Sequence, residues 1–163
     1  MQIETFWQLI EKSKVGANDC TEQADNLLQL LSDLEPSEIV SFEEHFDQKL
    51  IDAFRWDLWA VAYIVNGGAS DDGFLYFRGW LIGQGKDYFE AALANPENAA
   101  NNAVVGEFNE CEDILYVARQ AHEELTGDEL PTILNEPAQP SGENWEEEDV
   151  EEMFPKLAER FGS

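Results

Sequence analysis

Apolar residues recur along most of the chain at the spacing of one helical face, three or four positions apart. Stripes of this kind predict helices over residues 3–15, 20–34, 36–54, 86–95 and 114–126. Local signals support their ends: Asp19 can cap the second helix, Pro36 suits the first turn of the third, and Gly127 follows the last. No segment of useful length alternates in the manner of a β-strand, so the pattern predicts an all-α fold.

The segment 54–85 differs from the others because its two predicted helices, over residues 56–66 and 71–84, carry apolar side chains on every side. A helix that is apolar all round belongs inside a domain. Gly67 and Gly68 separate the two helices and allow a sharp turn. We therefore expect a single-domain bundle of about six to eight helices around a central helical hairpin.

A proline-containing stretch, followed by an acidic stretch, divides the chain into three parts. Residues 1–127 form the helical domain, residues 128–143 form a proline-containing linker, and residues 144–163 form an acidic amphipathic helix. Asn144 is a plausible cap for this helix, and Pro155 should kink or divide it. We expect the last part to dock on the domain, since a solvated acidic tail would not need its aromatic residues.

The central hairpin contains five charged residues within an apolar segment: Arg55, Asp57, Asp71, Asp72 and Arg78. The two adjacent aspartates suit a helix N-terminus, where Ser70 or Asp71 acts as the cap. Arg78 lies on an apolar side of the predicted helix over residues 71–84, so its charge must pair with another group. Arg55 and Asp57 should lie at the far end of the hairpin, near Gln84. We therefore expect the five charged residues to form two clusters.

These charges have two interpretations, a structural network or a ligand-binding site. The candidate binding residues are Arg55, Trp56, Asp57, Trp59, Ser70, Asp71, Asp72, Arg78 and Trp80.

The net charge of the chain excludes some classes of binding partner and favours others. The chain has 35 acidic and 9 basic residues, for a formal net charge of −26. Such a field repels phosphate backbones and anionic lipid headgroups, so we expect no direct nucleic-acid binding and no membrane binding. It favours a basic protein partner or a cation.

Compartment is predicted from three features. The N-terminus lacks a signal peptide pattern, and no stretch approaches the length of a membrane span. Cys20 and Cys111 are far apart in sequence and form no paired motif, so we expect no disulfide framework. A reducing cytoplasm is then the expected location.

Recognisable catalytic and metal-binding patterns are missing from the sequence. Neither cysteine has a histidine at helical spacing. Glu43, Glu44, His45 and Asp47 are close in sequence but match no zinc motif, and both glutamates and the aspartate are expected on a solvated face. His122 is likewise expected at the surface. We assign no catalytic residue, no metal and no cofactor.

Two classes of function remain. The first is a non-catalytic binding or regulatory module, of the inhibitor or immunity type, for a basic protein partner. The second is an enzyme that uses Asp71 or Asp72 as a general base and Arg78 or Arg55 as an anion clamp. We favour the first, because an anionic substrate would need exposed arginines and the helical wheel buries Arg78.

The segment RWDLWAVAYIVNGGASDDGFLYFRGWLIGQG resembles the hallmark of a bacterial family, domain of unknown function 4240. The opening FWQLIE, the segments LSDLEPSEIVSFEEHFD, FEAALANPE and ELTGDELP, and the tryptophan–acidic–FPxL tail fit the same family. The resemblance implies no established activity. Ala69 stands where the family often has cysteine, which argues against thiol chemistry at that position.

Overall fold

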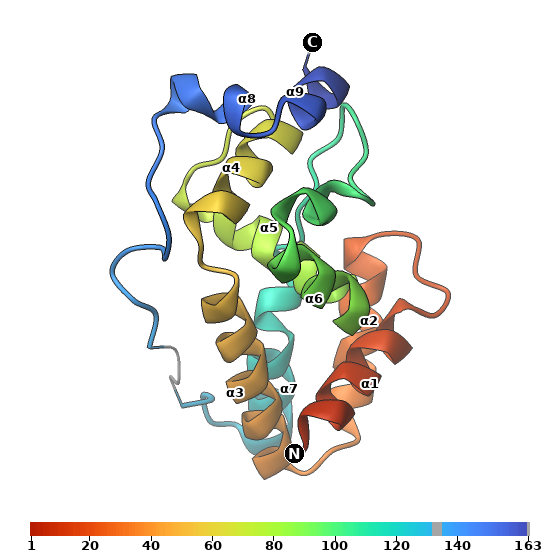
Figure 1. Cartoon of the computed structure of the whole chain (residues 1–163). Coiled ribbons are helices and arrows are strands. Elements are labelled where there is room, and N and C mark those ends of the chain that lie inside the picture. Colours follow the sequence, from red (N-terminus) through yellow and green to blue (C-terminus); the bar gives the residue numbers. More distant parts are fainter. Residues whose placement is uncertain (132–134, 163) are drawn as a thin grey trace.

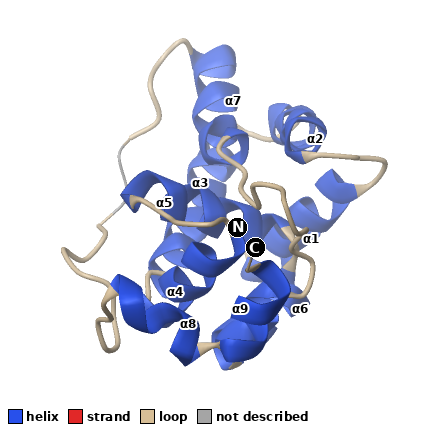
Figure 2. Ribbon diagram, turned by 90° about the horizontal axis from the view of Figure 1, so that it is seen from above, coloured by secondary structure: helices blue, strands red, loops and turns tan. Residues whose placement is uncertain are grey.

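The computed structural model describes residues 1–131 and 135–162. These residues form nine α-helices and no β-strand, so the all-α prediction is confirmed (Figures 1 and 2). The helices are α1 (Ile3–Lys14), α2 (Cys20–Ser32), α3 (Pro36–Asp52), α4 (Trp56–Val65), α5 (Asp71–Gly83), α6 (Lys86–Ala94), α7 (Val117–Thr126), α8 (Val150–Met153) and α9 (Pro155–Phe161). Three 3-10 turns, η1 (Pro96–Ala100), η2 (Asp113–Tyr116) and η3 (Glu147–Asp149), complete the described elements.

Helix α5 lies at the centre and contacts α1, α3, α4, α6 and η2. Below it in Figure 1, α3 packs on α7, α7 on α2, and α2 on α1. Above it, α8 and α9 cover α4. Fully buried phenylalanines fill the space between these layers, among them Phe6, Phe42, Phe74 and Phe77. The central helices are thus the apolar interior, as their sequence predicts.

Local capping explains where several helices begin. The Asp19 carboxylate accepts a 2.8 Å hydrogen bond from the Glu22 amide, and the Ser70 hydroxyl accepts one from the Gly73 amide at 3.1 Å. Glu35 and Glu38 form a capping box at the start of α3. Each bond satisfies a backbone N–H group that the helix itself leaves without a partner.

The C-terminal segment docks on α4 through both backbone and side chains. Ser141 donates a backbone hydrogen bond to Phe54 and accepts one from Trp56, at 3.0 and 2.9 Å. Val150 and Leu157 are buried against the helical domain. Pro155 separates α8 from α9, as predicted, because proline cannot continue a helix. The predicted cap at Asn144 is wrong, since the first helical turn begins only at Glu147.

Several predicted solvent faces are wrong. Glu43 and Asp47 are only 4% and 6% exposed, because α7 lies over that side of α3. His122 is also buried, and its Nδ1 atom lies 3.0 Å from the carbonyl oxygen of Asp128. Conversely, Leu125, an apolar residue of the predicted helix over residues 114–126, is 46% exposed at the end of α7. In the described residues, no helix combines the length and apolarity needed to cross a bilayer.

Gly79 allows α5 to approach the segment that contains the second cysteine. A Cβ atom at this position would lie 2.8 Å from the carbonyl oxygen of Cys111 and 3.2 Å from the Leu115 side chain. Gly79→Ala must therefore displace that backbone, and we expect urea unfolding to show a loss of about 2 kcal/mol. Gly73→Ala, in the same helix, places its Cβ 3.4 Å from Ser70 Oγ and 4.0 Å from Ala69 Cβ, which are ordinary contacts, and should instead gain about 0.5 kcal/mol. Equal effects of the two changes would contradict this packing.

Candidate functional site

Arg55 and Asp57 form a two-point ion pair at the start of α4. The Nε and Nη2 atoms of the arginine donate to the two carboxylate oxygens at 3.0 and 2.6 Å. Its Nη1 atom donates to the Leu93 carbonyl at 2.9 Å, at the end of α6. Among the described residues, Gln84, the predicted neighbour, makes no hydrogen bond to this guanidinium. The Gln84 side chain instead bonds Trp80 and Asn102. The ion pair joins α4 to α6, so the charges of Arg55 and Asp57 stabilise the fold.

Arg78 is enclosed in the interior, as the helical wheel indicates. It is 3% exposed, and its guanidinium lies 4.7 Å from the ring centres of both Phe54 and Phe74. Its Nη1 atom donates to the Leu50 carbonyl at 2.7 Å and to a carboxylate oxygen of Glu136 at 2.9 Å. Burial lowers the pKa of this guanidinium, and the Glu136 carboxylate opposes that effect.

The partner of this arginine comes from the C-terminal segment, and the aspartates of α5 remain apart from it. Its Nε atom has no hydrogen-bond partner among the described residues. Ser70, Asp71 and Asp72 are exposed at the N-terminus of α5, and neither carboxylate pairs with an arginine within the described chain. The structure therefore does not bring a general base and an anion clamp together in one pocket.

Three tryptophans assemble where α4 meets the C-terminal segment. The rings of Trp56 and Trp59 stack with their centres 5.3 Å apart, and the Trp145 ring meets both edge-on. Trp145 Nε1 donates to the Trp56 carbonyl at 2.6 Å, and Trp59 Nε1 donates to the Ala69 carbonyl at 2.9 Å. Edge-on and stacked aromatic pairs of this kind stabilise a fold beyond their buried area. Trp56 and Trp59 thus serve as the docking surface for the chain's own C-terminal segment.

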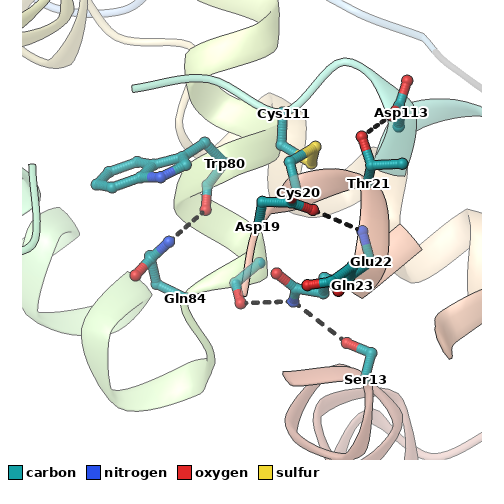
Figure 3. Close-up of a disulfide and its surroundings, with 11 residues drawn as sticks. Ser13, Asp19, Cys20, Thr21, Glu22, Gln23, Trp80, Gln84, Cys111 and Asp113 are labelled. Atoms are coloured by element: carbon teal, nitrogen blue, oxygen red, sulfur yellow. Dashed lines mark hydrogen bonds between the residues drawn. A yellow bond between two sulfur atoms is a disulfide. The ribbon is translucent and has the colours of Figure 1, made fainter. Parts of the chain in front are cut away.

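Trp80, the remaining predicted residue, lies elsewhere, in the wall of a pocket of about 320 Å³. The same wall contains Cys20 and Cys111, which are joined by a disulfide (Figure 3). The expectation that the two cysteines form no disulfide framework is therefore wrong. The two cysteines are 91 residues apart in the sequence, but their Cα atoms are 5.5 Å apart in the structure. Sequence distance carries no information about such a contact unless the packing of α2 against η2 is known.

Glu43 and Asp47 form a carboxyl pair whose burial the sequence reasoning missed. Burial, the Asp47 charge and a hydrogen bond to Asp47 raise the pKa of Glu43 to about 8. Burial also raises the pKa of Asp47, although the hydrogen bond from Glu43 and the charge of Arg119 act in the opposite direction. Two such carboxyl groups share a proton at neutral pH, with Glu43 as its holder. Their spacing of four residues could have indicated contact, but not burial.

A metal site is not supported by the described residues, since none of them form a group of three or more ligand side chains. The carboxyl groups of Glu43 and Asp47 on α3 thus form a cluster of two.

Arg78→Lys distinguishes a structural arginine from an exposed clamp. Lysine cannot place a planar guanidinium between Phe54 and Phe74, so we expect the unfolding free energy to fall by about 2 kcal/mol. Asp71→Asn changes only an exposed residue in the first turn of α5 and should cost at most about 0.5 kcal/mol. Urea denaturation of both variants checks this. An unchanged midpoint for Arg78→Lys would show that the arginine does not hold the interior together.

Comparison with known families adds one finding. A family model described as protein of unknown function (DUF4240) matches residues 1–124. The matched region contains all nine predicted binding residues and the buried carboxyl pair, but ends before the C-terminal segment. Searches of the curated proteins and of the solved structures found no match.

Proposed function

The chain belongs to the DUF4240 family of proteins of unknown function, and we propose that it is a non-catalytic binding module of the inhibitor or immunity type for a basic protein partner. The observation that carries this proposal is an acidic edge, defined as residues 143–152. Seven of these ten residues are aspartate or glutamate, and all seven are exposed. None of the seven forms an ion pair with another described residue.

The acidic edge is held in place by the residues between its carboxylates. Val150 is fully buried, and Trp145 is fixed by its hydrogen bond to Trp56 and its contacts with the α4 tryptophans. A charged surface that is already ordered loses less conformational entropy on binding than a free tail does. Neighbouring carboxylates also repel one another, and a basic partner relieves that repulsion.

The enzyme alternative has weaker support. Arg55 is engaged by Asp57, and Arg78 is enclosed between two rings and held by Glu136. An incoming anion would have to displace these contacts before either arginine could bind it. Nucleic acid and anionic membranes are not part of the proposal, because the charge of −26 opposes both.

Charge substitution tests the acidic edge. The edge variant neutralises four exposed carboxylates by Glu146→Gln, Glu147→Gln, Glu148→Gln and Asp149→Asn. The control variant neutralises four exposed carboxylates elsewhere, by Glu4→Gln, Asp25→Asn, Asp33→Asn and Glu44→Gln, so that both proteins carry the same net charge. Each immobilised protein is incubated with lysate of the source organism at low salt, and bound proteins are identified after a salt gradient.

We expect wild type and the control variant to retain a basic protein that elutes at moderate salt, and the edge variant to lose most of it. Recovery of no protein by wild type at low salt would count against a binding function. Equal losses in the two variants would show that net charge, rather than this surface, governs binding.

A cytoplasmic location stays a prediction, and the disulfide removes one of its supports. Stable disulfides are typical of oxidising compartments, whereas those of cytosolic proteins are usually transient and sense or transfer redox equivalents.

A further inference from the structure

The Cys20–Cys111 disulfide forms part of a pocket wall rather than lying sealed in the core. The pocket holds about 320 Å³, and its lining also includes Lys14. Trp80 and Gln84 line the same pocket and are drawn near the disulfide in Figure 3. Its two sulfur-bearing residues differ in access, since Cys111 is 3% exposed while Cys20 is half-buried. Cys20 is therefore the more exposed residue of the pair.

Cys20 is the first residue of α2, a helix of 13 residues. Its position places the sulfur beside the N-terminal end of the helix dipole, which favours a negatively charged thiolate. The Asp19 carboxylate partly opposes this effect, but it already accepts the Glu22 amide hydrogen bond. Lys14 also lines the pocket, where its ammonium group pairs with Glu11 at 3.5 Å and donates to the Gln84 carbonyl at 2.9 Å.

We propose that the pocket containing Cys20 and Cys111 is a thiol–disulfide exchange site whose substrate is a small dithiol. In the first step, one thiolate of the dithiol bonds to Cys20 Sγ, and the electron pair of the protein S–S bond leaves on Cys111 Sγ. In the second step, the other thiolate of the dithiol attacks its own sulfur in the mixed disulfide, and Cys20 leaves as a thiolate at the start of α2. Two electrons pass to the protein, the dithiol becomes a disulfide, and its two thiol protons end on the two cysteines.

The surroundings of Cys111 remain anchored after the bond breaks. Its amide donates to the Tyr76 carbonyl at 2.9 Å, and the nearby Asn109 amide donates to Asn66 Oδ1 at 2.7 Å. These contacts hold the segment to α5 and to the end of α4 without help from α2. The hydrogen bond from Thr21 on α2 to Asp113, at 3.0 Å, also does not depend on the disulfide. Reduction is therefore expected to break the cross-link without unfolding the chain.

Reduction of the native protein tests the site directly. Wild type is incubated with dithiothreitol in the absence of denaturant, samples are alkylated at intervals, and the labelled cysteines are counted by mass spectrometry. We expect complete reduction while circular dichroism retains the helical signal. With glutathione as a monothiol probe, trapping at low pH should give a mixed disulfide on Cys20. Reduction that occurs only in denaturant, or a mixed disulfide confined to Cys111, would overturn the proposal.

A pair of tryptophan variants tests whether the dithiol reaches the disulfide through the pocket. Ala17→Trp adds a large side chain to the pocket wall, whereas Val15→Trp adds the same side chain at an exposed position outside that wall. We expect Ala17→Trp to slow the reduction by dithiothreitol several-fold and Val15→Trp to leave its rate unchanged. Equal rates in the two variants and wild type would show that the dithiol does not reach the sulfur through the pocket.

Discussion

Replacement of both cysteines by serine is expected to lower the free energy of unfolding by about 4 kcal/mol. The disulfide closes a loop of 91 residues, from α2 to the segment before η2, and so restricts the unfolded chain much more than the folded one. Equilibrium urea unfolding of the Cys20→Ser/Cys111→Ser variant measures the loss.

The same experiment in dithiothreitol supplies the control. Wild type should fall to the stability of the double variant, because reduction removes the same cross-link, while the double variant itself should not respond. If wild type and variant unfold at the same urea concentration without reductant, the cross-link is not formed in the protein.

Glu43→Gln is expected to stabilise the protein, on the order of 3 kcal/mol at alkaline pH. Burial and the neighbouring Asp47 raise the pKa of Glu43 from 4.5 to about 8. Between these two values the folded protein binds a proton that the unfolded chain has released. Stability is therefore fully present below pH 4.5 and is lost as the pH rises through about 8. Glutamine stays neutral at every pH, so the variant should not show this loss.

Thermal or urea unfolding across this pH window gives the difference between variant and wild type. Glu44→Gln removes the same charge from an exposed position on α3 and should change stability little at any pH. Destabilisation by Glu43→Gln at alkaline pH would mean that the carboxylate is satisfied in its ionised form, contrary to its burial between α3 and α7.

Much of the fold could be predicted because its signals are local. The cap at Asp19, the proline at the start of α3 and the division at Pro155 each act within a few residues. The apolar character of α4 and α5 on all sides identified the interior before any packing was known. Burial of Arg78 also followed from its place on an apolar sector of α5.

The errors concern contacts between distant segments. The side of α3 that carries Glu43 and Asp47 is predicted to face solvent because both residues are charged. It is buried because α7, about 70 residues later in the chain, packs over it. The sequence did not indicate which group pairs with Arg78, and the partner is Glu136, in the distant C-terminal segment. The disulfide depends on the meeting of α2 and η2, for which the sequence contains no nearby signal.

The predicted binding residues consequently divide into groups with different roles. Arg55 and Asp57 join α4 to α6, Trp56 and Trp59 receive the C-terminal segment, and Trp80 lies beside the disulfide. Ser70 caps α5. The exposed carboxylates of residues 143–152 are the surface that the proposed basic partner would contact, and the proposal therefore supports a search for basic proteins ahead of anionic substrates.

The arginine side chains themselves can be observed by NMR, through the exchange rates and shifts of their Nε–H groups during titration with inorganic phosphate. If Arg78 belongs to the interior, its Nε–H signal persists against solvent exchange and does not move as phosphate is added. A rapidly exchanging signal that shifts to saturation with phosphate would mean that this guanidinium is an open anion site, and an enzyme or anion receptor would then be the better description of the protein.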